Sequence, residues 1–262
     1  MPEGDVILYF KTLFQKKYKN HRLIEIKTYK NINYPKDFKG DITKIDCFGK
    51  LLWFECDKKY YVHIHLKISG YFEFEKPEKN LKYEFVLSKD NIEKSIYLQD
   101  QRRLSEVNIY NYDEHIKILD KMGKYSIFDK GFTLEYFNNM FTKKKSICAF
   151  LLDQKYCVGV GNYMKSEVLY LSDINIYDKM NDLTKEQIEL LYKNIMFVAY
   201  SNLFTYLKDD NLVNNLEKKY LHNKPKRIEV PYQLKVYQQE KTPSGQKVFK
   251  VKINGRYTFY VK

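Results

Sequence analysis

Residues 147–170 read ICAFLLDQKYCVGVGNYMKSEVLY, two apolar segments joined by a glycine-rich turn at 159–162. Glycines at such a junction permit a tight turn and a close approach of the backbone to a ligand. The backbone N–H groups that open the second segment, with the Asn162 amide beside them, are suited to bind a phosphate. As a bare pattern, Gly-x-Gly-Asn can also simply join two core helices. The sequence therefore predicts a helical pair here, with an anion site as one interpretation of its turn.

The first five residues, Met1-Pro2-Glu3-Gly4-Asp5, carry a second candidate site. Removal of the initiator methionine would expose Pro2 as a secondary amine. An α-amino group has a pKa of roughly 7.7–8.0, so part of it is unprotonated at neutral pH. Such an amine attacks carbonyl-like carbons and forms a Schiff base, and Glu3 could supply the acid. The alternative is an ordinary helix start, with proline in the first turn and acids facing the positive end of the helix dipole.

Composition narrows the class of protein. The 262 residues are 44% hydrophobic and carry a formal net charge of +13, enough for one large or two modest domains with real cores. The basic excess favours a polyanionic partner, nucleic acid before acidic membrane, although a lysine-rich solubilising surface has the same charge. No apolar run approaches the roughly 20 residues of a membrane span. The four cysteines form no Cys-x-x-Cys pair, so we expect an intracellular, reduced chain.

Hydrophobic periodicity predicts the elements. Apolar residues at helical spacing predict a helix over 6–18. Short runs rich in aromatic and β-branched residues then predict the strands of a β-sandwich or barrel: 23–29, 41–47, 51–56, 61–66, 71–74, 83–87, 95–98 and 106–110. Further helices are expected at 115–121, 133–141, 146–152, 162–171 and 184–208, the last with a Thr184–Gln187 capping box. Residues 209–226 are polar and expected to form a mobile loop. Asn254-Gly255 predicts a type I′ hairpin between 247–253 and 256–261.

The expected fold is therefore α+β with two domains. Residues 1–115 form an N-terminal helix and a β-sandwich, and 116–130 form a linker. Residues 131–226 form a helical domain that contains the stretch 147–170. Residues 227–262 add a β-hairpin.

The stretch 147–170, together with the Pro2-Glu3-Gly4 start, resembles the formamidopyrimidine-DNA glycosylase / endonuclease VIII family, and looks most like its endonuclease VIII-like 1 type. The resemblance implies a bifunctional DNA glycosylase/AP lyase of base excision repair that acts through a Schiff base on Pro2, with β- and δ-elimination. It implies that residues 1–115 are the catalytic domain and that 131–226 are a DNA-binding domain whose helix–two-turn–helix lies at 147–170. It implies damaged duplex DNA, or single-stranded or bubble DNA, as partner. It also implies a monomer in an intracellular, DNA-containing compartment, with no membrane partner and no metal or organic cofactor.

The resemblance assigns roles to further residues. Lys50, in FGKLLWF at 48–54, matches the pocket lysine that contacts the phosphate beside the damaged nucleotide. Without the resemblance it would be one of many strand-end lysines. Arg102, Ile68 and Leu104 match the side chains that fill the gap left by an everted nucleotide. Ile68 stands where methionine is usual and Leu104 where phenylalanine is frequent, so discrimination of the opposite base is expected to differ.

The C-terminal hairpin departs from the family pattern. Relatives commonly carry a four-cysteine zinc finger there, whereas residues 232–262 contain no cysteine or histidine to bind zinc. The resemblance implies a zincless finger, held by apolar packing, that presents Arg256 to the phosphates flanking the lesion. Asp5 and Val6 replace the usual Pro-Glu. Cys148, where some relatives have lysine, is expected to pack rather than to react.

Several functions stay open at this point. Oxidised pyrimidines and ring-opened purines are the expected substrates, and an 8-oxoguanine- and formamidopyrimidine-preferring glycosylase is the runner-up. A non-catalytic damaged-DNA-binding protein would need neither Pro2, Glu3 nor Lys50. A basic ribosomal or membrane-surface protein would leave the motif at 147–170 unexplained.

Overall fold

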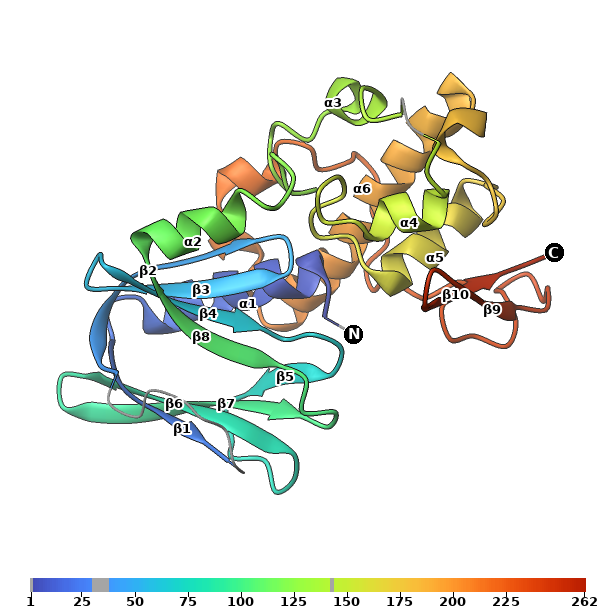
Figure 1. Cartoon of the computed structure of the whole chain (residues 1–262). Helices are drawn as coiled ribbons and strands as arrows, with labels where there is room; N and C mark the ends of the chain where they lie inside the picture. Colours follow the sequence, from blue (N-terminus) through green and yellow to red (C-terminus); the bar gives the residue numbers. More distant parts are fainter. Residues whose placement is uncertain (1, 30–37, 142–143) are drawn as a thin grey trace. The chain divides into compact units, whose positions relative to one another are not determined.

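The computed structural model describes residues 2–29, 38–141 and 144–262 (Figure 1). The chain divides into two compact units. Unit 1 contains Pro2 and Ile7–Asp120, and unit 2 contains Glu3–Val6 and Lys121–Lys262. Helix α1 (Gly4–Tyr18) thus gives its first turn to unit 2 and its remainder to unit 1. Over the described ranges, no helix has the length and apolarity that a bilayer crossing requires.

Unit 1 is the expected β-sandwich, with its strands in two antiparallel layers (Figure 1). One layer has the order β5-β7-β6-β1 and the other the order β2-β3-β4-β8, and β1 pairs with the start of β2 where the layers join. The strands are β1 Arg22–Thr28, β2 Gly40–Phe48, β3 Leu51–Cys56, β4 Tyr60–His65, β5 Gly70–Glu73, β6 Leu81–Lys89, β7 Ile92–Asp100 and β8 Glu106–Asn111. Each expected strand is present, and four of the eight have the expected length. β2 and β8 run two residues and one residue longer, and β6 and β7 run four and five residues longer.

Aromatic rings fill the core between the layers. The Phe14 ring of α1 lies 6.0 Å from Phe54 of β3 and 4.8 Å from Phe72 of β5, centroid to centroid, so α1 packs against both layers. Phe54 and Phe85 of β6 lie 6.0 Å apart across the sandwich. These residues are fully buried or nearly so. The alternation that predicted the strands therefore selects the side chains that join the two layers.

Helix α2 (Tyr112–Leu119) ends unit 1 and begins three residues earlier than the apolar spacing predicted. Asn111 and Glu114 form a capping box: the Asn111 side chain accepts from the backbone of Glu114, and the Glu114 carboxylate accepts from the backbone of Asn111. Such a cap satisfies two N–H groups that would otherwise lack partners. The cap therefore sets this boundary, and the hydrophobic pattern does not.

Unit 2 is helical and ends in a hairpin. Its helices are α3 Leu134–Asn138, α4 Ile147–Leu152, α5 Asn162–Leu171 and α6 Lys185–Asp209. The capping box of Thr184 and Gln187 at the start of α6 is confirmed. The hairpin is formed by β9 Phe249–Ile253 and β10 Arg256–Tyr260. Asn254 and Gly255 both have positive φ, 50° and 77°, as a type I′ turn requires.

The segment after α6 differs from the expectation of a mobile polar loop. It contains two 3₁₀ helices, Val213–Asn215 and Lys218–Leu221. Leu212, Leu216 and Tyr220 are buried, and the Tyr200 hydroxyl donates to the Tyr220 carbonyl at 2.6 Å. Burial of Leu212, Leu216 and Tyr220 therefore holds this mostly polar segment against the rest of unit 2.

Candidate active site

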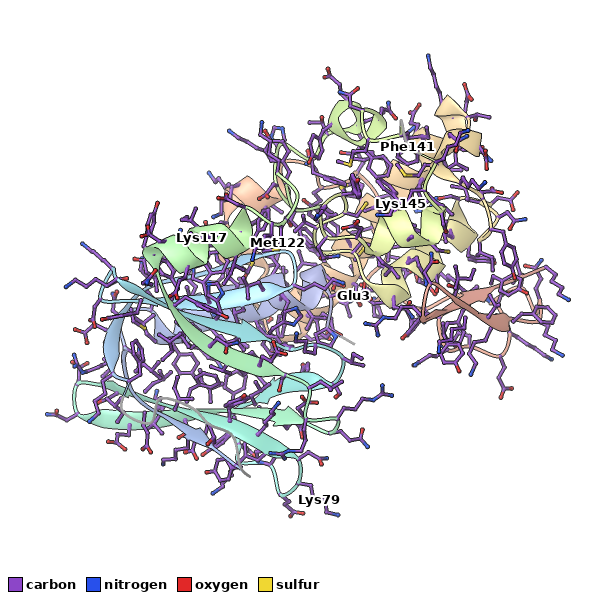
Figure 2. The ribbon with its side chains drawn as sticks, in the orientation of Figure 1. Glu3, Lys79, Lys117, Met122, Phe141 and Lys145 are labelled. Atoms are coloured by element: carbon purple, nitrogen blue, oxygen red, sulfur yellow. The ribbon has the colours of Figure 1, made fainter. Side chains whose placement is uncertain are left out.

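The carboxylate of Glu3 sits on the N-terminus of α5, within unit 2 (Figure 2). Its Oε2 accepts a hydrogen bond from the Gly161 backbone N–H at 2.7 Å, and its Oε1 accepts one from Tyr163 at 2.8 Å. The Met164 N–H adds a third, at 3.4 Å. These are the orphan donors of a helix start, where the helix dipole also favours a negative charge. The turn between α4 and α5 therefore binds an anion, and this anion is a side chain of the protein itself.

Two glycines make this contact possible. A Cβ at Gly161 would lie 2.3 Å from Cδ of Glu3, inside the carboxylate. A Cβ at Gly4 would lie 2.9 Å from the Cα of Gly159, whose carbonyl accepts the Gly4 N–H at 2.9 Å. The first residues of the chain thus lie directly against the glycine-rich turn. The two motifs that the sequence marked as separate candidates form one site.

Asp5 and Val6, which replace the usual family residues, are both buried. The Asp5 carboxylate accepts hydrogen bonds from the Tyr163 hydroxyl and from the Asn202 amide. Burial raises the pKa of Asp5 against the opposing effect of these bonds, and burial with the nearby carboxylate raises the pKa of Tyr163 well above its usual range. The first turn of α1 is therefore bound to α5 and α6 by a buried polar cluster.

Pro2 is buried directly before this turn, and Met1 lies outside the described residues. Lys50, in unit 1, lies half-buried in the turn between β2 and β3. Its charge acts on His65, whose pKa falls to about 4 because of burial first and the charges of Lys67 and Lys50 second. The ring of His65 is therefore neutral at pH 7, and its Nδ1 accepts the Lys67 N–H at 3.1 Å.

The three residues expected to fill the gap beside an everted nucleotide lie on two neighbouring turns of unit 1. Arg102 and Leu104 are exposed between β7 and β8, and Ile68 is half-buried between β4 and β5. Their side chains are available to a ligand, since 45% of Leu104 is exposed. The apolar residue at this position is thus a surface residue, although apolar side chains of its size are usually buried.

Asp100, at the end of β7, ties these two turns together. Its Oδ1 accepts the Ser69 hydroxyl at 2.5 Å and the Arg102 N–H at 3.1 Å, and its Oδ2 accepts the Ser105 N–H at 2.6 Å. Burial alone would raise the pKa of Asp100, but the hydrogen bonds outweigh it and hold the pKa below its usual range. One carboxylate therefore fixes the neighbours of Ile68, Arg102 and Leu104.

A buried lysine side chain organises the phosphate-binding candidates of unit 2. The ammonium of Lys165 donates to Asn162 Oδ1 at 2.9 Å, to Thr258 Oγ1 at 2.8 Å and to the Tyr257 carbonyl at 3.3 Å. Lys165 has no exposed surface. Because Arg256 and Thr258 are two residues apart in β10, they share a face of the strand. Asn162 and Arg256 are therefore brought to the same end of α5.

The hairpin was expected to be held by apolar packing, and this expectation was incomplete. The rings of Tyr237 and Phe259 do lie 5.0 Å apart. Polar contacts from α5 also hold the hairpin: besides Lys165, the Ser166 hydroxyl accepts the Phe259 N–H at 3.3 Å. Side chains of one helix thus supply attachment points that a zinc site could otherwise provide.

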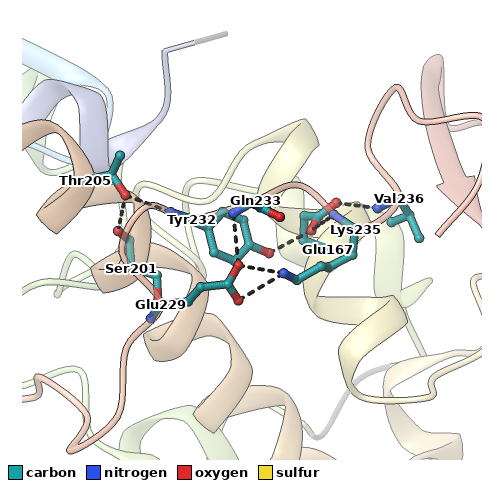
Figure 3. Close-up of polar contacts among 8 residues, drawn as sticks. All are labelled: Glu167, Ser201, Thr205, Glu229, Tyr232, Gln233, Lys235 and Val236. Atoms are coloured by element: carbon teal, nitrogen blue, oxygen red, sulfur yellow. Dashed lines mark hydrogen bonds and ion pairs between the residues drawn. The ribbon is translucent and has the colours of Figure 1, made fainter. Parts of the chain in front are cut away.

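The chain leading to the hairpin is anchored by Glu167 (Figure 3). This carboxylate has no exposed surface. It accepts the Tyr232 hydroxyl at 2.7 Å and the backbone N–H groups of Lys235, Val236 and Tyr237 at 2.8–2.9 Å. Each of the two carboxylate oxygens thus accepts two hydrogen bonds, and such bonds offset the cost of burying a carboxylate.

Sequence reasoning missed Asp100, Lys165 and Glu167. A signal was present for the last two, because Lys165-Ser166-Glu167 is a polar run inside an otherwise apolar helix, and all three residues are buried. Cys148 is buried as expected, its thiol donating to the Ile176 carbonyl at 3.3 Å, and burial raises its pKa. Within the described ranges, no group of three or more metal-ligating side chains comes together.

Two stretches of the chain match two domains of one protein family. Residues 1–107 match the formamidopyrimidine-DNA glycosylase N-terminal domain, and residues 125–203 match the formamidopyrimidine-DNA glycosylase H2TH domain. The second match contains the glycine-rich turn that holds Glu3.

Similar proteins carry the same name. The chain is 33% identical over 224 residues to the formamidopyrimidine-DNA glycosylase of Rickettsia conorii, covering 82% of this chain and 78% of that protein. It is 30% identical over 195 residues to that of Ligilactobacillus salivarius, covering 71% and 70%.

Solved structures share the fold. The MutM (Fpg) protein of Thermus thermophilus has a TM-score of 0.78 at 20% identity, over 99% of this chain and 97% of that chain. The Lactococcus lactis Fpg protein, in a complex with DNA that contains N7-benzyl-Fapy-dG, has a TM-score of 0.76 at 20% identity, over 99% and 98%.

Proposed function

The chain belongs to the formamidopyrimidine-DNA glycosylase family, and on that premise we propose that it is a bifunctional DNA glycosylase and AP lyase of base excision repair. DNA that contains a damaged base is its substrate, and a DNA-containing compartment is where it acts. The net charge of +13 agrees with a polyanionic substrate.

The main support for this proposal is the position of the Glu3 carboxylate at the N-terminus of α5. Pro2 is bonded to Glu3, so a chain that has lost Met1 presents its amine next to a carboxylate whose position is fixed by backbone N–H groups. An amine beside a positioned acid is what nucleophilic attack on a sugar carbon needs. Gly161 makes room for the carboxylate, and Gly4 makes room for the backbone of Gly159; this close fit supports a role for the contact beyond an ordinary helix start.

In the proposed reaction, the Pro2 nitrogen forms a bond with the anomeric carbon while the bond from this carbon to the damaged base breaks. Glu3 takes the proton that the Pro2 nitrogen loses and passes it to the sugar ring oxygen as the ring opens. The departing base takes a proton from water, and an imine joins protein and DNA. Loss of the proton at C2′ then expels the 3′ phosphate by β-elimination. The 5′ phosphate leaves in a following δ-elimination, and water releases the enzyme. These steps are drawn without a metal or an organic cofactor.

In this proposal, side chains of both units hold the DNA. We assign Lys50, Asn162 and Arg256 to the phosphates near the lesion, where they set register without reading sequence. Ile68, Arg102 and Leu104 occupy the space that the everted nucleotide leaves. The hairpin delivers Arg256 as a zincless finger, and the protein works as a monomer.

For the substrate, we propose oxidised pyrimidines and ring-opened purines. The Pro-Glu-Gly start and the hairpin without cysteines support the endonuclease VIII-like side of the family. A preference for formamidopyrimidine and 8-oxoguanine is the second candidate, and the names of the relatives favour it. Ring-opened purines belong to both candidates.

Borohydride trapping on abasic DNA tests the nucleophile. The mature chain should form a covalent complex, because borohydride reduces the imine. A chain that keeps Met1, checked by mass spectrometry, and a Pro2→Gly variant should both lose it. Undiminished trapping in either would show that Pro2 is not the nucleophile.

Nicking of oligonucleotides with one defined lesion tests the substrate. Thymine glycol, a ring-opened purine, 8-oxoguanine and an abasic site are compared under single-turnover conditions. Faster cleavage at thymine glycol than at 8-oxoguanine supports the first candidate, and the reverse order supports the second. Cleavage of the abasic site alone would leave a lyase without glycosylase activity and would contradict both.

A further inference from the structure

Lys165 is a buried ammonium that the proposed chemistry does not use. It lies on the first turn of α5, inside unit 2, and none of its surface reaches solvent. Burying a charge is costly unless its hydrogen bonds are satisfied. A methionine or leucine would fill the same space without that cost, so the position of this charge calls for a function.

All three N–H bonds of the ammonium have acceptors, and these acceptors come from two elements. One is Asn162 Oδ1 in α5, at 2.9 Å. The other two are Thr258 Oγ1 and the Tyr257 carbonyl in β10, at 2.8 and 3.3 Å. A lysine ammonium has three donors and no acceptor. Lys165 is therefore fully used as a link between α5 and the hairpin.

The link determines which way Asn162 faces. Since Oδ1 accepts from Lys165, the NH₂ group of the amide must point elsewhere and remains a donor. Asn162 is half-buried, and its Nδ2 is not one of the fully buried side-chain atoms that lack a partner among the described residues, so this donor remains accessible to a ligand. An amide donor fixed at a helix N-terminus, where an anion is favoured, is pre-organised for a phosphate oxygen.

The same link places Arg256. Its neighbours Tyr257 and Thr258 are bound to Lys165, and Arg256 shares the face of β10 that carries Thr258. The Arg256 charge is close enough to lower the pKa of Lys165. Two cations remain near each other here because one is buried and bonded and the other is exposed.

We propose that Lys165 is a positioning residue that orients Asn162 and Arg256 together, so that the two form one site for the DNA phosphates beside the lesion. The proposal rests on the function proposed above. Lys165 itself does not touch DNA. It acts through the two residues that its hydrogen bonds hold.

The salt dependence of DNA binding tests this proposal. Each phosphate contact adds about 0.9 to the slope of log affinity against log salt concentration. Lys165→Met should weaken binding to duplex DNA that carries a tetrahydrofuran abasic analogue by about tenfold or more, the cost of a charge-assisted hydrogen bond. It should lower the slope by about one, because Arg256 is the one cation in the pair of residues that Lys165 positions. Val168→Ala is the matched control, because Val168 is fully buried in the same helix and has no polar role; its slope should not change. An unchanged slope in Lys165→Met overturns the proposal.

A double-mutant cycle with Arg256→Ala separates positioning from stability. If Lys165 acts through Arg256, Lys165→Met should reduce the DNA affinity less in a protein that already carries Arg256→Ala than in the unmutated protein. The loss of binding free energy in the double variant should then be clearly smaller than the sum of the two single losses. Additive losses would contradict the proposal even where both variants are stable.

The pH dependence of DNA binding by the unmutated protein provides a further test. The pKa of Lys165 is lowered to about 8, by burial first, with Cys148 and Glu3 raising it and Arg256 lowering it further. Above that pH the amine loses a donor, so the affinity for tetrahydrofuran DNA should fall between pH 7 and 9. The fall should be absent in Lys165→Arg, which stays charged. A flat profile in the unmutated protein overturns the proposal. The tetrahydrofuran analogue forms no imine, so failure of imine trapping would instead contradict the proposed function.

Discussion

Oxygen Oε2 of Glu3 lies 2.7 Å from the backbone nitrogen of Gly161, although 158 positions separate the two residues in the chain. This contact joins the first residues of the protein to the turn that opens α5. It needs a residue without a side chain at position 161, because a Cβ there would overlap the carboxylate. The sequence suggested that Gly161 serves a tight turn. The structure shows that the Glu3 side chain, from the N-terminus, also requires a glycine at this position.

Gly161→Ala should displace Glu3 and slow removal of the damaged base about 10- to 100-fold, the scale expected when a reacting group moves by about 1 Å. The φ of Gly161 is −132°, which alanine adopts, so backbone strain adds little. Overpacking should cost about 1–3 kcal/mol of unfolding free energy. Single-turnover rates and urea unfolding measure both. Gly245→Ala is the control: it has positive φ and open space around it, so it should lose some stability and keep its rate. A normal rate in Gly161→Ala would show that the seat of Glu3 is dispensable.

Asp100→Asn should lower the unfolding free energy by about 1–3 kcal/mol. The backbone N–H groups of Arg102 and Ser105 donate to the two oxygens of Asp100, and an asparagine would offer only one of them an acceptor. The pKa of Asp100 is held below its usual 3.8, so its contribution is present above about pH 4 and is lost as the pH falls through the lower folded value. The difference between the variant and the unmutated protein should therefore shrink below pH 4 in urea titrations. The exposed Asp90 provides the control Asp90→Asn, with little expected change. A difference that stays constant down to pH 2 would contradict this account.

Leu104→Phe should leave stability within about 0.5 kcal/mol, because almost half of Leu104 is exposed. It should tighten binding to DNA with an abasic analogue, since a ring stacks on a base for about 1–3 kcal/mol. Affinities measured with each of the four bases opposite the analogue check this and report any change in discrimination. Leu104→Ala should weaken binding to the same DNA. Equal affinities in the unmutated protein, Leu104→Phe and Leu104→Ala would mean that the side chain does not reach the DNA.

The stability of unit 1 should fall as the pH drops below 6.5. His63 Nε2 and His115 Nδ1 lie 2.8 Å apart, and both rings are buried. Burial first, and the charge of His115 second, lower the pKa of His63 to about 3, so the unfolded chain takes up a proton that the folded chain does not. The contribution of His63 is complete above pH 6.5 and declines by about 1.4 kcal/mol per pH unit towards pH 3, or about 2 kcal/mol at pH 5.

His63→Gln should reduce that slope by about one proton, since the amide nitrogen can replace Nε2 without titrating. His222→Gln, at an exposed position, should leave the slope unchanged. Chemical unfolding at pH 7, 6 and 5 distinguishes them. An identical slope in His63→Gln would assign the acid sensitivity to other groups.

Sequence alone determined the elements whose information is local. Alternation predicted the strands of the sandwich, Asn254-Gly255 predicted the hairpin turn, and Thr184 with Gln187 predicted the start of α6, because period, φ preference and capping act within a few residues. The glycine-rich turn and the residues around Pro2 were recognised as candidate sites for the same reason. The start of α2 was misplaced because an N-terminal capping box, and not the apolar pattern, sets where this helix begins.

Only the tertiary structure decided how these sites are built. Nothing near Glu3 in sequence predicts that it caps α5, nothing near Asp100 predicts its bond to Ser69, and Lys165 reads as one lysine among many. Hydrogen-bond partners of Asp100, Lys165 and Glu3 lie 31, 93 and 158 positions away in the sequence. A buried charge is tolerated only where folding brings its hydrogen-bond partners to it, and the sequence order does not record which partners those are.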